Sequence, residues 1–230
     1  MIKDNFPDEK AFDLSQAEIE AILPADFIWR NENDIIAQVG NLFYIACCER
    51  VDKQIECSKS TAVFDNEEVG SLSKQGADST LASVVIQKIW QAFGKNAVDC
   101  MSDISDGMMI SVDVAHAYHP NYPAPQDITN YPLMNQGFIL KTASNQSYAW
   151  DPEILGALID LCDRKDIPVQ RFVKHSNTKG GGTIASVISS HLPMRTADLG
   201  VGLLAMHSAC EMMGIKDQVA LTQFAKAFFE

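Results

Sequence analysis

The chain has 230 residues, of which 47% are hydrophobic, so it can bury a substantial core, and we expect one large domain. Its formal net charge of −12 excludes the basic face that nucleic acid or an anionic membrane surface requires. The six cysteines form no CxxC pair and no regular framework, which is typical of reduced thiols. The first residues carry no apolar run that would indicate a secretory signal. We therefore expect a cytoplasmic protein with no nucleic-acid or membrane partner.

The first third of the chain is predicted to hold a divergent segment, a helix and a strand. Residues 1–33 have low core content, with a short helical pattern at 15–23. Residues 34–50 are strongly apolar and predict a buried helix, and a short β-rich run follows at 61–65. That run ends at two adjacent acids, Glu67 and Glu68.

The acidic pair requires a bend in the backbone. Neighbouring side chains of a strand point to opposite faces, so a straight strand would separate Glu67 from Glu68. Gly70 permits a sharp turn directly after them. Adjacent acids are more often part of a solvated loop, and that interpretation stays open on the pair alone.

Strands and helices alternate through the remainder of the chain. This order predicts an α/β fold with a mostly parallel central sheet and helices on both faces. The apolar patterns predict helices at 77–93, 151–164, 183–192 and toward residue 229, and strands at 107–114, 137–142, 168–173 and 194–200. Asp151 and Pro152 are typical of a helix N-cap and first turn.

Several chemically useful side chains follow the predicted strands. In an open α/β sheet, ligands bind beyond the carboxyl ends of the strands. Carboxylates and a histidine suit zinc, and a further glutamate beside a ligand can act as base for metal-bound water. The candidates are Glu67, Glu68, Asp113, Lys141, the glycines 180–182 and His207.

Each candidate also has a structural interpretation. Asp113, with His116 and His119 after it, could be a hydrogen-bonded strand end. His207 lies in an apolar stretch, where a histidine is more often a satisfied core residue than a ligand. The glycine run could be a turn into an N-capped helix or an anion site at its first amides, and it lacks the lysine of a P-loop.

The motifs together resemble the aspartyl aminopeptidase family of zinc metallopeptidases. The resemblance rests on DNEEVGS (65–71) with QGA (75–77), SVDVAHAYHPNY (111–122), LKTASNQSYA (140–149), GGTI (181–184) and ADLGVGLLAMHS (197–208). These motifs follow the family's order with about its spacing. They imply a zinc-aminopeptidase-like (phosphorylase/hydrolase-like) domain over 34–230, without the family's inserted dimerisation domain.

The resemblance implies a role for each matched residue. Glu67 corresponds to the general base, Glu68 and His207 to the ligands of one zinc, and Asp113 to a ligand of the other. The substrate-holding positions of the family correspond to His116, Lys141, Tyr148, Gly182 and Thr183. The implied activity is removal of the N-terminal residue of a peptide, which in this family is often acidic, and Lys141 could pair with its carboxylate.

The sequence departs from the family's pattern at two metal ligands. The family needs an upstream histidine, yet the first histidine here is His116, and Gly40 stands where a bridging aspartate is expected. A metal held by one or two side chains binds weakly. Two hypotheses follow: a zinc metalloaminopeptidase or truncated member of that family, and a catalytically inactive relative that binds peptides or an intact homologue. A homo-oligomer is a further expectation.

Overall fold

The computed structural model describes residues 27–30, 35–39, 42–51, 54–178 and 180–229, with side chains from residue 62 onward. Two compact units make up the chain, Met1–Met101 and Ser102–Glu230. The helix predicted at 15–23, the boundary after residue 33 and Gly40 lie outside the described residues. No helix among the described residues is long and apolar enough to cross a membrane.

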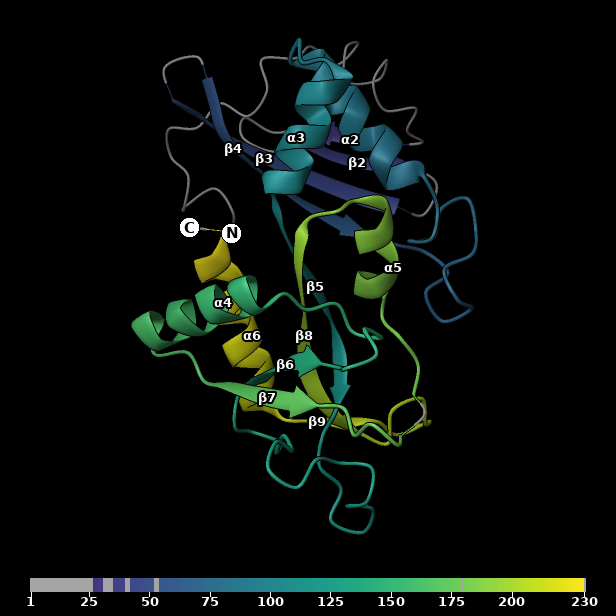
Figure 1. Ribbon diagram of the computed structural model, residues 1–230, viewed down its shortest axis with the longest axis vertical. Helices are drawn as coiled ribbons and strands as arrows, with labels where there is room; N and C mark the ends of the chain where they lie inside the picture. The colour runs from purple at the N-terminus through teal and green to yellow at the C-terminus, as the bar shows by residue number, and fades with distance from the viewer. Residues whose placement is uncertain (1–26, 31–34, 40–41, 52–53, 179, 230) are drawn as a thin grey trace. The chain divides into compact units, whose positions relative to one another are not determined.

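The first unit contains a four-stranded antiparallel sheet, β1-β2-β3-β4, with its strands in chain order (Figure 1). This sheet shows that the helix predicted at 34–50 is wrong, because β2 and β3 cover that stretch. Val39 and Leu42 are register partners on these two antiparallel strands. An apolar run suits a buried strand as well as a buried helix, and Gly-Asn at 40–41 is a hairpin signal. The strands are Phe27–Arg30, Ile35–Val39, Leu42–Val51 and Gln54–Val63.

Two helices follow this sheet. Helix α2, Leu81–Ala92, confirms the predicted helix, and the left-handed φ of +74° at Gly94 lies just beyond its end. Helix α3, Ala97–Asp106, was not predicted. Asn96 begins it, because its Oδ1 accepts the backbone N–H groups of Val98 at 2.8 Å and Asp99 at 3.0 Å.

The second unit is built on a five-stranded mixed sheet that confirms the α/β class. The strand order is β5-β8-β6-β7, with the short β9 beside β8. β5 runs parallel to β8 and β6 parallel to β7, whereas β6 and β8 are antiparallel. The strands are Met108–His116 (β5), Phe138–Thr142 (β6), Val169–Val173 (β7), Arg195–Leu204 (β8) and Met212–Met213 (β9).

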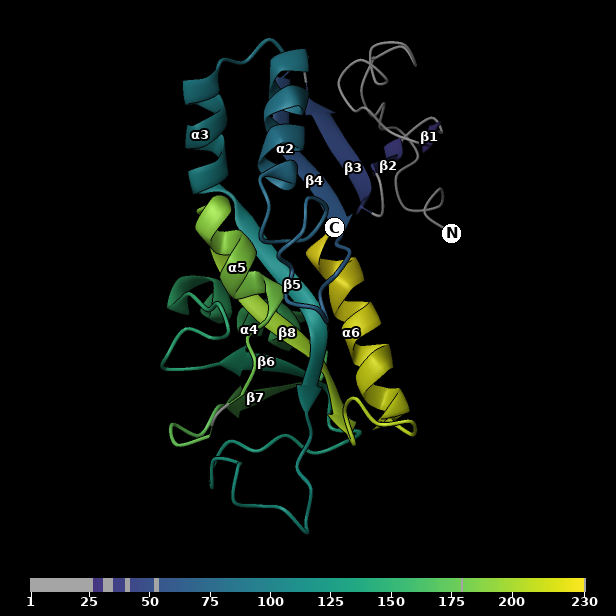
Figure 2. The same ribbon diagram turned by 90° about the vertical axis from the view of Figure 1, so that its right-hand side faces the viewer.

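Helices cover both faces of this sheet. Helices α4, Pro152–Lys165, and α6, Ile215–Phe228, pack on one face in a core that includes Leu140 and Leu199. Figure 2 shows α5, Ile184–His191, and α6 on opposite sides of β5 and β8. Because side chains alternate along a strand, the positions next to Leu140 and Leu199 face α5. These positions include Lys141 and Asp198.

The N-cap of α4 differs in one respect from the prediction. Asp151 has the extended backbone of an N-cap and Pro152 opens the helix. Its carboxylate, however, accepts the backbone N–H of Thr196 at 2.7 Å and makes no cap hydrogen bond to α4. The aspartate therefore ties the start of α4 to β8.

Asp217, in the first turn of α6, holds the chain that leads into β6. Its side chain is fully buried, and its two oxygens accept the backbone N–H groups of Asn135 and Gly137, each at 2.7 Å. Asn135 Oδ1 in turn accepts the N–H of Lys216 at 3.2 Å. This carboxylate therefore fixes the entry to the strand that carries Lys141.

Replacing Asp217 by asparagine should destabilise the chain by about 2–4 kcal/mol, because a buried charge-assisted hydrogen bond is lost and an amide donor then faces a backbone N–H. Urea denaturation monitored by circular dichroism measures the free energy of unfolding. Asp163→Asn is the matched control, since Asp163 is exposed on α4, and it should change that value by less than about 0.5 kcal/mol. Equal effects of the two substitutions would contradict the role of Asp217.

Candidate functional site

The acidic pair of the first unit lies on a tight turn, as the sequence predicted. Asn66 and Ser71 have left-handed φ values of +61° and +62°, and the N–H of Gly70 donates to the carbonyl oxygen of Glu67 at 2.9 Å. Ser71 also donates its N–H to the carbonyl oxygen of Asn66 at 2.9 Å. The turn leaves Glu67 partly buried and Glu68 exposed. The backbone therefore presents both carboxylates from one short segment.

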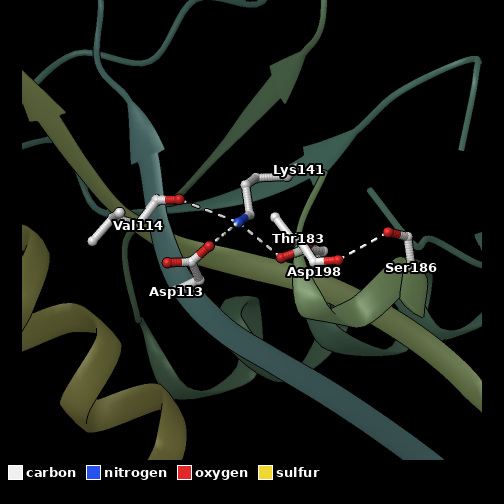
Figure 3. A network of polar contacts seen from close by, with 6 residues as sticks. All are labelled: Asp113, Val114, Lys141, Thr183, Ser186 and Asp198. Atoms are coloured by element: carbon white, nitrogen blue, oxygen red, sulfur yellow. Dashed lines mark hydrogen bonds and ion pairs between the residues drawn. The ribbon is translucent and has the colours of Figure 1, made fainter. Parts of the chain in front are cut away.

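A buried ion pair lies at the centre of the second unit. Lys141 Nζ is 2.8 Å from Asp198 Oδ1, and these side chains are 1% and 0% exposed. Lys141 and Asp198 are register partners on the antiparallel strands β6 and β8. Figure 3 shows the ammonium group between Asp198, Asp113 and the carbonyl oxygen of Val114, which accepts from Nζ at 3.2 Å. Asp198 and Val114 are therefore within hydrogen-bond distance of Nζ, whereas Asp113 Oδ2 lies farther away, at 3.7 Å.

Thr183 connects this pair to helix α5. Its hydroxyl donates to Asp198 Oδ2, while its carbonyl oxygen accepts from the hydroxyl of Ser186 at 2.8 Å (Figure 3). Thr183 occupies the N-cap position of α5 but makes no side-chain cap hydrogen bond, since its hydroxyl is used by Asp198. Burial raises the pKa of Asp198 above its ordinary value, although the Lys141 ammonium and the Thr183 hydroxyl oppose this.

Asp113 is the accessible carboxylate of the group. Its side chain is 34% exposed and its Oδ2 lies 3.7 Å from Lys141 Nζ, farther than Asp198. Its register partner on β8 is Gly200, and a Cβ there would lie 2.1 Å from the carbonyl oxygen of Asp113. A glycine is therefore required where β5 and β8 approach beside this carboxylate.

Tyr148 lies between two lysines. The Nζ atoms of Lys141 and Lys174 are each 5.3 Å from the centroid of its ring, within cation–π range. Burial, followed by the charges of Asp198 and Asp113, raises the pKa of the Tyr148 hydroxyl. The tyrosine is therefore a neutral aromatic side chain that lines the site. The centroids of its ring and the Phe172 ring are 6.1 Å apart.

The two histidines lie at the end of the parallel strands β5 and β8. His116 ends β5, and His207 follows β8 with a left-handed φ of +65° and a backbone N–H that donates to Glu211 Oε1 at 2.5 Å. His207 is exposed, so it is not a core histidine. Partial burial, with the charges of His207, Lys141 and Lys174, holds the pKa of His116 below its ordinary 6.5.

Most of the candidate residues in the second unit therefore lie close together. Asp113, Lys141, Thr183 and Tyr148 share the network, and Gly182 lies beside it, because a Cβ there would be 3.2 Å from the carbonyl oxygen of Ser147. The group forms on the α5 face of the sheet. Lys141 lies next to the last residue of β6, as the sequence predicts, whereas Asp113 lies within β5 and not at its end.

Two residues of the group were not singled out from the sequence. Asp198 lies within a predicted strand whose neighbours are apolar, and a lone carboxylate in such a strand needs a buried counter-charge. This pattern is the signal by which the sequence could indicate Asp198. Lys174 directly follows β7 and is 8% exposed, and nothing in its sequence context distinguishes it from a surface lysine.

Comparison with known proteins identifies the class of this chain as M18 aminopeptidase. Over 179 residues the chain is 41% identical to "Probable M18 family aminopeptidase 2" of Clostridium novyi, covering 76% of this chain and 41% of that protein. It is 35% identical to "Aspartyl aminopeptidase 1" of Schizosaccharomyces pombe, covering 75% and 36%. The structure of the S. cerevisiae mApe1 dodecamer matches with a TM-score of 0.67 and 28% identity, covering 81% and 45%.

The family model of aminopeptidase I zinc metalloproteases (M18) matches residues 32–229. The chain belongs to this family, and zinc is the cofactor expected from it. The chain spans about two-fifths of the length of the curated relatives, 41% and 36% for the two given above. The resemblance inferred from the five motifs is therefore confirmed.

The donor chemistry of the candidates suits zinc, but the described residues of either unit form no complete centre by themselves. Glu67 and Glu68 belong to the first unit and Asp113 and His207 to the second. Among the residues that the structure describes, no three His, Cys, Asp or Glu side chains gather as a metal-binding group. A structural zinc site typically has four protein ligands and a catalytic one three, and the residues described in each unit do not reach that number.

The buried ion pair gives a stability prediction. Asp198→Asn should lower the free energy of unfolding by about 3–5 kcal/mol, because it leaves the Lys141 ammonium buried without its counter-charge. The double variant Lys141→Met with Asp198→Asn removes both charges and should recover most of that loss. Urea denaturation of both proteins measures it. If the double variant were as unstable as the single one, the charge pair would not be the cause.

A second prediction concerns His116 in the metal-free chain. Its pKa should lie below 6.5 and should rise in Lys174→Met, since one of the opposing positive charges is removed. The Cε1–H resonance of the imidazole, followed by NMR against pH, measures this. Because the folded chain binds fewer protons at His116 than the unfolded chain just below pH 6.5, this residue lowers stability as the pH falls through that range.

Lys226→Met, on the exposed last turn of α6, is the control for this titration. It removes the same charge away from the site and should leave the pKa of His116 unchanged. A pKa that moves equally in both variants would indicate a general charge effect instead of a local one.

Proposed function

We propose that the chain is the part of a zinc metalloaminopeptidase that binds a peptide and hydrolyses its N-terminal residue. The observation that carries this proposal is the arrangement of Asp113, Lys141 and Asp198 on one face of the sheet. Asp198 holds the Lys141 ammonium 0.9 Å closer than Asp113 does, by the difference between 3.7 Å and 2.8 Å. Asp113 is thereby left accessible for a ligand while its charged neighbour is fixed.

The metal ligands proposed are Glu68, Asp113 and His207, on the match of their motifs to the family. Carboxylate and imidazole groups are ordinary zinc ligands. Zinc, when bound, polarises the scissile carbonyl and makes water a better nucleophile at neutral pH. The exposure of His207 and the 34% exposure of Asp113 support this role, because a ligand has to be reachable.

Glu67 is proposed as the general base. Its position beside Glu68 on the tight turn gives two adjacent carboxylates different tasks, one holding a metal and the other taking a proton from water and passing it to the leaving amine. The left-handed backbone at Asn66 and Ser71 supports this division, because it turns the chain at the pair. The partial burial of Glu67 and exposure of Glu68 give the two acids different surroundings.

The peptide-binding residues proposed are His116, Lys141, Tyr148, Gly182 and Thr183. Tyr148 provides a buried aromatic wall, and Thr183 anchors the start of α5 through Asp198. Gly182 brings the backbone close to Ser147 without a side chain. These contacts order one side of the site before any peptide binds, which lowers the entropic cost of binding.

Metal content and turnover test the proposal. The purified chain should contain zinc by mass spectrometry and should hydrolyse aspartyl or leucyl anilides. Glu67→Gln should keep its zinc and lose at least about 100-fold in rate, as expected on removal of a general base. Glu68→Gln should lose zinc, and Glu153→Gln, an exposed change on α4, should alter neither.

A chain with neither zinc nor turnover would contradict the proposal. Binding of peptides without hydrolysis would then favour the inactive relative, and restored turnover on mixing with an intact homologue would identify that homologue as the partner. These outcomes separate the two hypotheses without relying on sequence.

The proposal extends to assembly and location. One of the structural neighbours is described as a dodecamer, which supports a homo-oligomer here, and light scattering after gel filtration measures its mass. A cytoplasmic location is supported by Cys162, which is a free, buried thiol.

A further inference from the structure

Residues 75–77 (QGA) are a motif matched to the family that has no task in the proposed chemistry. They carry neither a charge nor a metal ligand. Gly76 and Ala77 are buried, and Ala77 is only 1% exposed, so the segment is not a free loop. Its contacts lead back to residues 65–71 of the same unit, which carry Glu67 and Glu68 and which we call the acid turn.

Gln75 closes one end of the acid turn with its side chain. Its Nε2 donates to Asp65 Oδ2 at 3.1 Å, in a partly buried contact between residues ten positions apart. Asp65 follows the end of β4 and directly precedes the segment with Glu67 and Glu68. A hydrogen bond to an ionised carboxylate contributes more than one between neutral groups. The bond therefore ties the chain that enters the turn to the QGA segment.

The backbone closes the other end of the acid turn, at Ser71. The Ser71 carbonyl oxygen accepts the N–H groups of Ser73 at 3.0 Å and Asp78 at 3.3 Å. A Cβ at Gly76 would lie 2.2 Å from the same oxygen, so only a glycine permits this approach. Ser71 itself is 4% exposed and has a left-handed φ of +62°. A residue with a side chain keeps such a backbone only where its surroundings hold it, and here residues 76–78 do so.

Helix α2 supports the QGA segment. The Ser79 hydroxyl donates to the carbonyl oxygen of Gly76 at 2.8 Å, and its Oγ accepts the N–H of Leu81 at 3.2 Å. Leu81 is the first residue of α2, which has buried residues along its length. The support of the acid turn thus runs from a packed helix through Ser79 and Gly76 to Ser71.

The charges of the acid turn give such a support a physical reason. Asp65, Glu67 and Glu68 place three carboxylates within four positions of a chain whose net charge is already −12. Like charges at this spacing repel one another and favour a more open backbone. The amide of Gln75 satisfies Asp65 without adding a charge. A lysine at this position would also pair with Asp65, but its charge would compete with a metal ion for the two glutamates.

We propose that Gln75 is a positioning residue, which acts through Asp65 to hold the acid turn in one conformation before a metal or a peptide binds. Glu67 and Glu68 then keep the arrangement in which one carboxylate binds metal and its neighbour takes a proton. Groups that surrounding contacts fix in advance lose less entropy on binding. The inference rests on the proposed function for the tasks of the two glutamates, and it deepens that function by giving the QGA segment a role in it.

Amide hydrogen exchange of the metal-free chain, followed by NMR, tests the hydrogen bond without any turnover. The N–H of Ser71 donates to the carbonyl oxygen of Asn66 at 2.9 Å, so it exchanges when the acid turn opens. Gln75→Met should speed this exchange by about 10-fold or more, as expected on loss of a hydrogen bond to a charged group. Gln87→Met is the matched control, because Gln87 is exposed on α2, and it should leave the rate unchanged.

An exchange of the two side chains separates the hydrogen bond from the bulk of Gln75. Gln75→Glu sets two carboxylates against each other and should also speed the exchange at Ser71. The double variant Gln75→Glu with Asp65→Asn lets the asparagine amide donate to the new carboxylate, and it should restore the wild-type rate within about threefold. If Gln75→Met does not fold, these two variants carry the comparison. The amide of Phe224, a fully buried residue of α6, should exchange equally in every variant that is folded.

Zinc binding shows whether the hydrogen bond serves the site. Competition with a chromophoric chelator measures the zinc affinity, which should fall by about 10-fold in Gln75→Met and recover in the double variant, as expected for a residue that orients a ligand. With leucyl anilide, kcat should fall by about 10-fold or more while KM stays within about twofold, since Glu67 acts on the attacking water.

The exchange and zinc results together decide the role of Gln75. Faster exchange at Ser71 that the double variant restores, with a parallel loss and recovery of zinc affinity, supports the inference. An unchanged rate in Gln75→Met, or a double variant as fast as Gln75→Glu alone, overturns it, and so does faster exchange with the zinc affinity and kcat of the wild-type chain. If the wild-type chain holds no zinc and shows no turnover, the restored exchange leaves the role of Gln75 in the acid turn standing while the proposed function fails.

Discussion

The ion pair between Lys141 and Asp198 is the constraint on which the second unit depends. Both side chains are buried, with 1% of Lys141 and 0% of Asp198 exposed. Each buried charge is stabilised by the opposite charge 2.8 Å away. The pair joins β6 to β8 across their antiparallel contact, and Thr183 attaches α5 to the same carboxylate. One interaction therefore fixes two strands and the helix that covers them.

The same ion pair determines which carboxylate of the site is available to bind a ligand. Asp198 is used in balancing Lys141 and in accepting the hydroxyl of Thr183, so it is a structural carboxylate although it lies in the site. Asp113 is farther from the ammonium and partly exposed. The two aspartates differ most in burial, since the side chain of Asp113 is 34% exposed and that of Asp198 is 0% exposed. The accessible aspartate is the one that can bind a ligand.

The helices and strands of the second unit could be predicted from the sequence, because each has a hydrophobic pattern typical of its type and about as long as the element itself. Alternation and N-cap signals located β5, β6, α4 and α5 within a few residues. Residues 34–50 were misassigned, because a strongly apolar run shows no clear helical or strand period. The partnership of Lys141 with Asp198 was also missed. It depends on the antiparallel pairing of β6 with β8, which no local pattern encodes.

Lys174 and Gln126 show where local rules of burial fail in this fold. A buried ammonium with neutral partners lowers the stability of the free chain, and so does a buried amide oxygen that accepts no hydrogen bond from the described residues. Natural proteins break such rules mainly at functional sites, where a ligand supplies the missing partner.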